Sequence, residues 1–153
     1  MDWLAESYLI ENLKRDGTWE VQFGAARADY RCLTCDGEIE VSIEVIASYT
    51  AGDFATLGQR YLAERRQFCA ELVRQQAGRC LGTAPTRYRA LKGFHSAQEL
   101  AGRHVSEIVF FNHDREHGRE LIRGRISMDA GTEPAGNLIE MFRYHMARLT
   151  LFY

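Results

Sequence analysis

The chain has 153 residues, of which 46% are hydrophobic and 26% are charged, and its formal net charge at pH 7 is −2. This composition excludes an intrinsically disordered chain, and the length predicts a single domain over residues 1–153. The negative net charge, with arginines scattered among acidic residues, argues against a nucleic-acid-binding protein.

Charge is distributed unevenly along the chain. Residues 1–64 hold twelve acidic and five basic residues, giving −7, whereas residues 65–153 hold nine acidic and fourteen basic residues, giving +5. We interpret the two parts as neutralising each other within one fold, and the alternative is an acidic or basic docking face.

The sequence carries no pattern for a membrane or for export. Its longest apolar runs are only a few residues, which predicts no transmembrane segment and no membrane partner. Asp2 and Glu6 lie where a signal peptide would carry lysines, so we expect a cytoplasmic protein. In such a protein, cysteines are predicted to be reduced thiols rather than a disulfide framework. The chain has four of them: Cys32, Cys35, Cys69 and Cys80.

The first elements in chain order are a short helix over residues 2–14 and a strand over residues 18–23. A hairpin follows, because Asp36-Gly37 between two β-rich arms favours a two-residue type I′ turn with Cys35 opposite Glu38. That register places five residues on one face, which we expect to contact a long helix. They are Tyr30, Cys32, Ile39, Val41 and Ile43.

The longest helical pattern runs from Asp53 to Gly78, with Asp53 as its predicted cap and Gly78 as its predicted stop. Its apolar side chains share an arc of about 160°. They are Phe54, Leu57, Tyr61, Leu62, Phe68, Cys69, Leu72 and Val73. Gly58 and Arg65 interrupt this arc, and the glycine predicts a closely packed neighbour. A lone buried cation is costly, so Arg65 is predicted to pair with a sheet carboxylate or to extend to the edge; the alternative is a binding residue for an anion or a partner.

From residue 82 onward the patterns predict a loop over 82–85, a strand over 86–91, one helical turn over 96–102, strands over 104–112 and 121–128, and a helix over 137–149. Residues 149–153 keep a strand as the alternative. The apolar run Ile108–Phe111 indicates a strand covered on both faces. The sequence therefore predicts an α+β fold: an antiparallel sheet of about five to six strands packed on one long central helix, about 53–78, with shorter N- and C-terminal helices.

Two short motifs suggest chemistry. Cys32-Leu-Thr-Cys35 has the spacing of a redox site or of half a zinc site. Because residues three apart in a strand point to opposite faces, we interpret both cysteines as structural, and the alternative is a looser turn that brings the thiols together.

The second motif, His113-Asp-Arg-Glu116-His117, matches H-x-x-E-H and resembles the inverzincin signature in these five positions. That resemblance implies that His113 and His117 ligate zinc and that Glu116 activates water. The motif lies between two strand-like runs and is followed by Gly118. We therefore predict a polar hairpin turn with no metal and no cofactor, and a zinc-dependent hydrolase is the alternative.

No nucleophile elbow, phosphate-binding loop or dinucleotide motif occurs, so the sequence favours a protein that is not an enzyme. We predict a small soluble protein-binding domain, such as a bacterial secretion chaperone, an adaptor or a toxin-immunity protein. The predicted order of elements is loosely similar to that of secretion chaperones, without a shared motif. A protein partner is expected, with a homodimer as a further option. A third hypothesis is a small-molecule carrier with its cavity between the sheet and the long helix.

Overall fold

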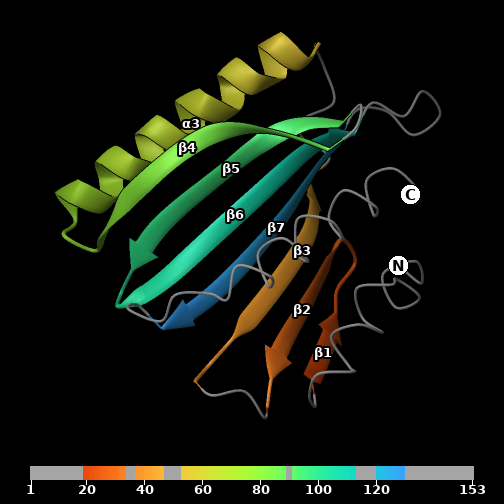
Figure 1. Ribbon diagram of the computed structural model, residues 1–153, viewed down its shortest axis with the longest axis vertical. Helices are drawn as coiled ribbons and strands as arrows, with labels where there is room; N and C mark the ends of the chain where they lie inside the picture. The colour runs from red at the N-terminus through yellow and green to blue at the C-terminus, as the bar shows by residue number, and fades with distance from the viewer. Residues whose placement is uncertain (1–18, 34–36, 47–52, 89–90, 113–119, 130–153) are drawn as a thin grey trace.

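A computed structural model of the chain describes residues 19–33, 37–46, 53–88, 91–112 and 120–129. These residues form a mixed α/β fold with seven strands and one helix (Figure 1). In chain order the elements are β1 (Trp19–Phe23), β2 (Arg27–Cys32), β3 (Glu40–Ile46), α3 (Phe54–Arg74), β4 (Gly78–Tyr88), β5 (Leu91–Leu100), β6 (Arg103–Asn112) and β7 (Glu120–Asp129). The predicted helices over 2–14 and 137–149, and the alternative strand over 149–153, lie outside the described residues.

The strands form one antiparallel sheet in the order β1-β2-β3-β7-β6-β5-β4. Strands β1 to β3 follow one another, α3 then carries the chain to the far edge, and β4 to β7 return until β7 pairs with β3 (Figure 1). The central β3–β7 ladder thus joins the first part of the chain to the last.

The sheet has more strands than the sequence predicts, and the difference lies in β4 and β5. The predicted loop over 82–85 belongs to β4, and the predicted helical turn over 96–102 overlaps β5. The helical interpretation of Ser96 is wrong because this residue lies in β5, where it pairs with Thr83 of β4 on one side and with Glu107 of β6 on the other.

The β2–β3 hairpin forms, but its predicted register is wrong by two residues. Arg31 lies opposite Glu40, whereas the two-residue turn would have placed Leu33 there. Strand β2 ends at Cys32 and β3 begins at Glu40, and the Cys32 N–H donates a hydrogen bond to the Ile39 carbonyl at 3.0 Å. A shift of two preserves which residues share a face.

Helix α3 begins as predicted and ends earlier than predicted. The Asp53 carboxylate accepts a hydrogen bond from the Thr56 N–H at 2.9 Å, which confirms the cap. The helix ends at Arg74, and the left-handed conformation falls on Gln76 with φ 53°. Gly78 instead opens β4, where an added Cβ would lie 1.9 Å from the Glu99 carbonyl oxygen. The glycine therefore serves strand packing rather than helix termination.

Helix α3 packs on the face of the sheet that carries Phe94, Val109, Phe111 and Leu121, which we call the helix face. Leu57 and Tyr61 are the buried helix residues of this core. Gly58 has the Phe94 ring 3.3 Å from the position of an added Cβ, which confirms the predicted close neighbour. Val73, predicted to be apolar and inward, is exposed. The buried stripe of α3 instead follows Leu57, Tyr61, Arg65 and Leu72.

The prediction that α3 covers the Tyr30, Val41 and Ile43 side of the hairpin is wrong. Ile43 pairs with Gly124, whereas Glu44 pairs with Arg123, so Ile43 points to the far face of the sheet. The far face is buried as well, and its largest members are Tyr30, Ile43, Ile108, Phe110, Ile122 and Ile126. The four residues of the run Ile108–Phe111 are buried on both faces of β6, as predicted.

The predicted reduced state of the cysteines is wrong for every cysteine that the structure describes. Cys69 of α3 and Cys80 of β4 form a disulfide with their Cα atoms 5.8 Å apart. The short α3–β4 connection brings them together. Cys32 is also disulfide-bonded, and Cys35 lies outside the described residues. Within the part of the chain that the structure describes, no helix is long and apolar enough to span a membrane.

Candidate binding site on the helix face

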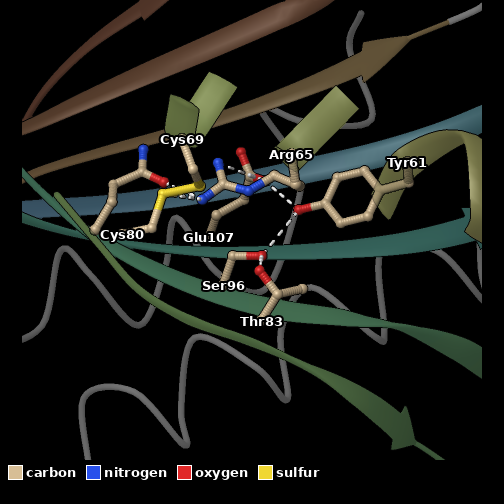
Figure 2. Close-up of a disulfide and its surroundings, with 8 residues drawn as sticks. Tyr61, Arg65, Cys69, Cys80, Thr83, Ser96 and Glu107 are labelled. Carbon is tan, nitrogen blue, oxygen red and sulfur yellow. Dashed lines mark hydrogen bonds and ion pairs between the residues drawn. A yellow bond between two sulfur atoms is a disulfide. The ribbon is translucent and has the colours of Figure 1, made fainter. Parts of the chain in front are cut away.

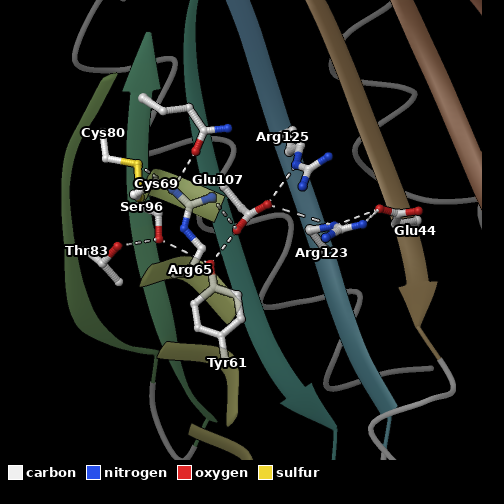
Figure 3. A network of polar contacts seen from close by, with 11 residues as sticks. Glu44, Tyr61, Arg65, Cys69, Cys80, Thr83, Ser96, Glu107, Arg123 and Arg125 are labelled. Atoms are coloured by element: carbon white, nitrogen blue, oxygen red, sulfur yellow. Dashed lines mark hydrogen bonds and ion pairs between the residues drawn. A yellow bond between two sulfur atoms is a disulfide. The ribbon is translucent and has the colours of Figure 1, made fainter. Parts of the chain in front are cut away.

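A buried carboxylate, Glu107 of β6, is the centre of a polar network on the helix face (Figure 3). The Tyr61 hydroxyl donates a hydrogen bond to Glu107 Oε2. Arg125 Nε donates to Glu107 Oε1 at 2.7 Å. Arg65 Nη1 and Arg123 Nε each lie 3.9 Å from one of the two Glu107 oxygens. One carboxylate therefore faces three guanidinium groups and a phenol.

Arg65 lies beneath α3 with 7% of its surface exposed. Its Nη2 donates to Gln98 Oε1 at 2.5 Å and lies 3.8 Å from Cys80 Sγ (Figure 2). Its guanidinium carbon lies 4.9 Å from the centre of the Phe68 ring. Among the described residues no group accepts a hydrogen bond from Arg65 Nε, although this atom is buried. Arg65 was predicted to pair with a carboxylate of the sheet, and Glu107 is that carboxylate. A binding role for Arg65 stays a prediction.

Tyr61 acts as a neutral donor in this network. Burial raises its pKa, and the neighbouring Glu107 charge raises it further, because both disfavour the phenolate. The Tyr61 hydroxyl also lies 3.1 Å from Ser96 Oγ, which lies 3.1 Å from Thr83 Oγ1 (Figure 2). These hydroxyls connect the helix to β5 and to the edge strand β4.

Arg123 extends the network toward β3. Its Nε donates to Glu44 Oε1 at 2.7 Å (Figure 3). Glu44 also lies 3.6 Å from Arg27 Nη1, and Arg27 in turn forms an ion pair with Asp29 at 2.9 Å. The network therefore crosses the β3–β7 ladder.

Two pockets adjoin this network. The first, which we call the helix pocket, has a volume of about 310 Å³ and lies between α3 and strands β3, β6 and β7. It is lined by Ile46, Tyr61, Glu64, Arg65, Phe68, Glu107, Leu121, Arg123 and Arg125.

The second, which we call the sheet groove, has a volume of about 460 Å³ and lies on strands β1–β3 and β5–β7. It is lined by Glu20, Gln22, Arg27, Asp29, Tyr30, Arg31, Glu40, Val41, Ser42, Gln98, Leu100, Val105, Arg125 and Ser127. Arg125 belongs to the lining of both pockets, so they meet at this side chain.

No group of three or more potential metal ligands occurs among the described residues. His113, Glu116 and His117 lie outside them. The segment that carries this motif joins β6 to β7, which pair antiparallel as far as Asn112 opposite Glu120.

Sequence reasoning missed Glu107, Gln98 and the pair Arg123 and Arg125 as members of one network. A signal for part of it was present, because Arg123 and Arg125 are two residues apart in the predicted strand over 121–128 and therefore share a face. Glu107 was also detectable as a charge beside the apolar run that begins at Ile108. A carboxylate in a central strand must be paired, because burying it alone is costly.

No protein-family model and no curated protein sequence matches this chain. Among solved structures, the chain is similar to PA94, a protein of unknown function from Pseudomonas aeruginosa, with a TM-score of 0.48 and 10% sequence identity. The match covers 90% of this chain and 97% of that one. No function follows from a likeness at this level.

Proposed function

We propose that this protein is a non-enzymatic protein-binding domain that holds a segment of a partner protein in the sheet groove. The observation that carries the proposal is the groove itself, which extends over strands of both halves of the sheet. Its lining combines balanced charges with the apolar side chains of Leu100 and Val105. Mixed composition of this kind is typical of interfaces between proteins that also exist apart.

The charges in the groove favour selection of a partner over raw affinity. Arg31 Nη2 lies 2.5 Å from Glu20, and Arg27 Nε lies 2.9 Å from Asp29, so these exposed groups are already paired. A partner must replace or extend these pairs, which rewards a complementary pattern and penalises others. A secretion chaperone, an adaptor and an immunity protein are the three forms of this proposal.

Site-specific photo-crosslinking in the producing cells tests the location. A crosslinking residue at Gln22, which is exposed in the groove, should capture a defined partner. The same residue at Ala84, which is exposed on the edge strand β4, is the matched control and should capture none. Capture of the same protein from both positions would contradict the proposed groove.

Charge reversal then tests the contact with the captured partner. Arg31→Glu should weaken binding about tenfold in a calorimetric titration, because it places like charges beside Glu20. Arg79→Glu is the matched control: Arg79 is also exposed and also pairs with a glutamate of the neighbouring strand, Glu99 at 2.8 Å, but outside the groove. Equal losses in both variants would exclude the groove as the binding surface.

A small-molecule carrier is the second candidate, and the helix pocket favours it. The pocket lies between the sheet and the long helix, as that hypothesis requires, and its volume is at the lower end of about 300–1,000 Å³ for ligand sites. A native mass spectrum should then contain protein with one bound compound. A spectrum of ligand-free protein alone would count against the carrier.

A zinc-dependent hydrolase using His113, Glu116 and His117 stays the third hypothesis. It predicts one zinc ion per chain in elemental analysis of the purified protein and its loss in His117→Ala. Metal-free protein would exclude it.

A further inference from the structure

Counted over the described residues, the network beneath α3 contains one more positive charge than negative charge. Three arginines, Arg65, Arg123 and Arg125, face two carboxylates, Glu44 and Glu107, which leaves +1.

Among the described residues, no ion pair around the network removes this excess. Glu40, which lines the sheet groove together with Arg125, is exposed and forms no ion pair with the three arginines. Glu64 at the helix pocket pairs with Arg60 at 3.4 Å, and Asp29 pairs with Arg27 at 2.9 Å, so each pair adds no net charge. An excess cation beside buried side chains is unfavourable unless an anion compensates it.

Donors without acceptors accompany the excess charge. Arg65 Nε is buried and has no partner among the described residues. Arg125 donates to Glu107 through Nε, and no described residue accepts from its two terminal nitrogens. Arg125 also keeps 35% of its side chain exposed, so a ligand in either pocket can reach it.

We propose that the helix pocket binds a carboxylate, received by the terminal nitrogens of Arg125 and by the field of Arg65 and Arg123. An excess of one charge fits a monoanion better than a phosphate, which carries close to two charges near neutral pH. A guanidinium group also matches the two oxygens of a carboxylate geometrically. The apolar lining residues Ile46, Phe68 and Leu121 leave room for a short hydrocarbon stem on the acid.

This inference deepens the carrier candidate by naming a ligand class, and it rests on that candidate only for the location of the site. It does not depend on a partner in the sheet groove. The carboxylate has two sources, a free small acid or the side chain of a partner, and the experiment separates them.

Titration of the whole protein with acetate at constant ionic strength tests the site, followed by nuclear magnetic resonance of the arginine side-chain N–H groups. We expect saturable shifts of the Arg125 and Arg65 signals. Arg125→Gln should weaken acetate binding about tenfold, because it removes the excess charge and the terminal donors. Arg79→Gln is the control, since Arg79 is paired with Glu99 and lines neither pocket. Unsaturable shifts, or equal binding by Arg125→Gln and the native protein, would overturn the proposal.

A second variant changes binding in the opposite direction. Glu44→Gln removes the closer of the two carboxylate partners of Arg123 and raises the excess from +1 to +2. Acetate should then bind several-fold more tightly. Weaker binding by a folded Glu44→Gln protein would contradict the electrostatic argument, whatever the fate of Arg125→Gln.

Two blocked tripeptides identify the source. An acetylated and amidated Gly-Asp-Gly that binds more tightly than acetate assigns the site to a partner side chain, and tighter binding of acetate assigns it to a free acid. Gly-Asn-Gly has the same shape without the charge. If both peptides bind, equal affinities of the asparagine and aspartate peptides would refute carboxylate recognition. None of these titrations uses the partner protein of the sheet groove. If the helix pocket binds no carboxylate, the proposal that the sheet groove binds a partner is therefore unaffected.

Discussion

Gly93 of β5 allows its strand to lie against β6 more closely than a side chain would permit. An added Cβ would lie 1.8 Å from the Val109 carbonyl oxygen and 3.0 Å from Phe110 Cδ1, and both neighbours are fully buried. We expect Gly93→Ala to lower the free energy of unfolding by about 2–4 kcal/mol, measured by urea denaturation. Gly24→Ala is the control, because its nearest contact is at an ordinary 3.7 Å. Similar losses in both variants would show that the β5–β6 approach is not constrained.

Tyr61 makes stability depend on pH in the alkaline range. Its pKa is raised above the ordinary 10.0, first by burial and then by Glu107. A raised folded-state pKa contributes stability that is fully present below the unfolded-state value and is lost as pH rises past it. Between about pH 10 and pH 11, Tyr61→Phe should therefore reduce the fall in unfolding free energy by about 1 kcal/mol. Tyr30, whose pKa burial also raises, adds a second such contribution. An unchanged pH slope in Tyr61→Phe would mean that its phenol ionises in the native state.

Arg65, one helical turn after Tyr61, shows how much a helical periodicity in the sequence can predict. The pattern identified Arg65 as an exception on an apolar face, because a residue's place on a helix follows from sequence alone. Its partners Gln98 and Glu107 come from strands more than thirty residues away. No local pattern specifies which strands will pair, so the network itself was not predictable.

At the scale of elements, the Cys69–Cys80 disulfide ties α3 to the edge strand β4. It closes a loop with a sequence separation of 11 residues. Removing the crosslink by a double substitution, Cys69→Ser with Cys80→Ser, should lower the unfolding free energy by about 3 kcal/mol in urea denaturation, because the unfolded chain regains loop entropy. It also removes the sulfur beside Arg65 Nη2. A double variant as stable as the native protein would show that the α3–β4 connection needs no crosslink.

Element prediction succeeded where a strand or helix carries one dominant period. Strands β1, β6 and β7 and the start of α3 follow the expected residues closely. It failed in β4 and β5, where Gly82, Pro85 and Gly93 are residues typical of loops. The edge position of β4 tolerates proline, and Gly93 is required by close packing, so tertiary pairing overrides the local preference.

At the scale of the whole molecule, the uneven charge distribution is resolved within the sheet. Arg123 of β7 pairs with Glu44 of β3, and Arg103 of β6 lies 3.9 Å from Glu38. These contacts join the acidic first part of the chain to the basic second part, which supports the neutralisation that the sequence suggested. Seven described strands in one sheet also agree with the antiparallel α+β class, although the number exceeds the predicted five to six.

The β3–β7 ladder has a consequence for folding kinetics. Its partners, from Glu40 with Ser127 to Ile46 with Leu121, are separated by 87 to 75 residues along the chain. The ladders among strands β4 to β7, in contrast, each join strands that follow one another along the chain. Because a long loop must lose entropy before its ends can pair, we expect the residue 78–129 meander to form first and the residue 19–46 unit to dock onto β7 late in folding. The helix pocket and the sheet groove both contain residues of this late unit, so the binding surface is complete only after the last strand pairing has formed.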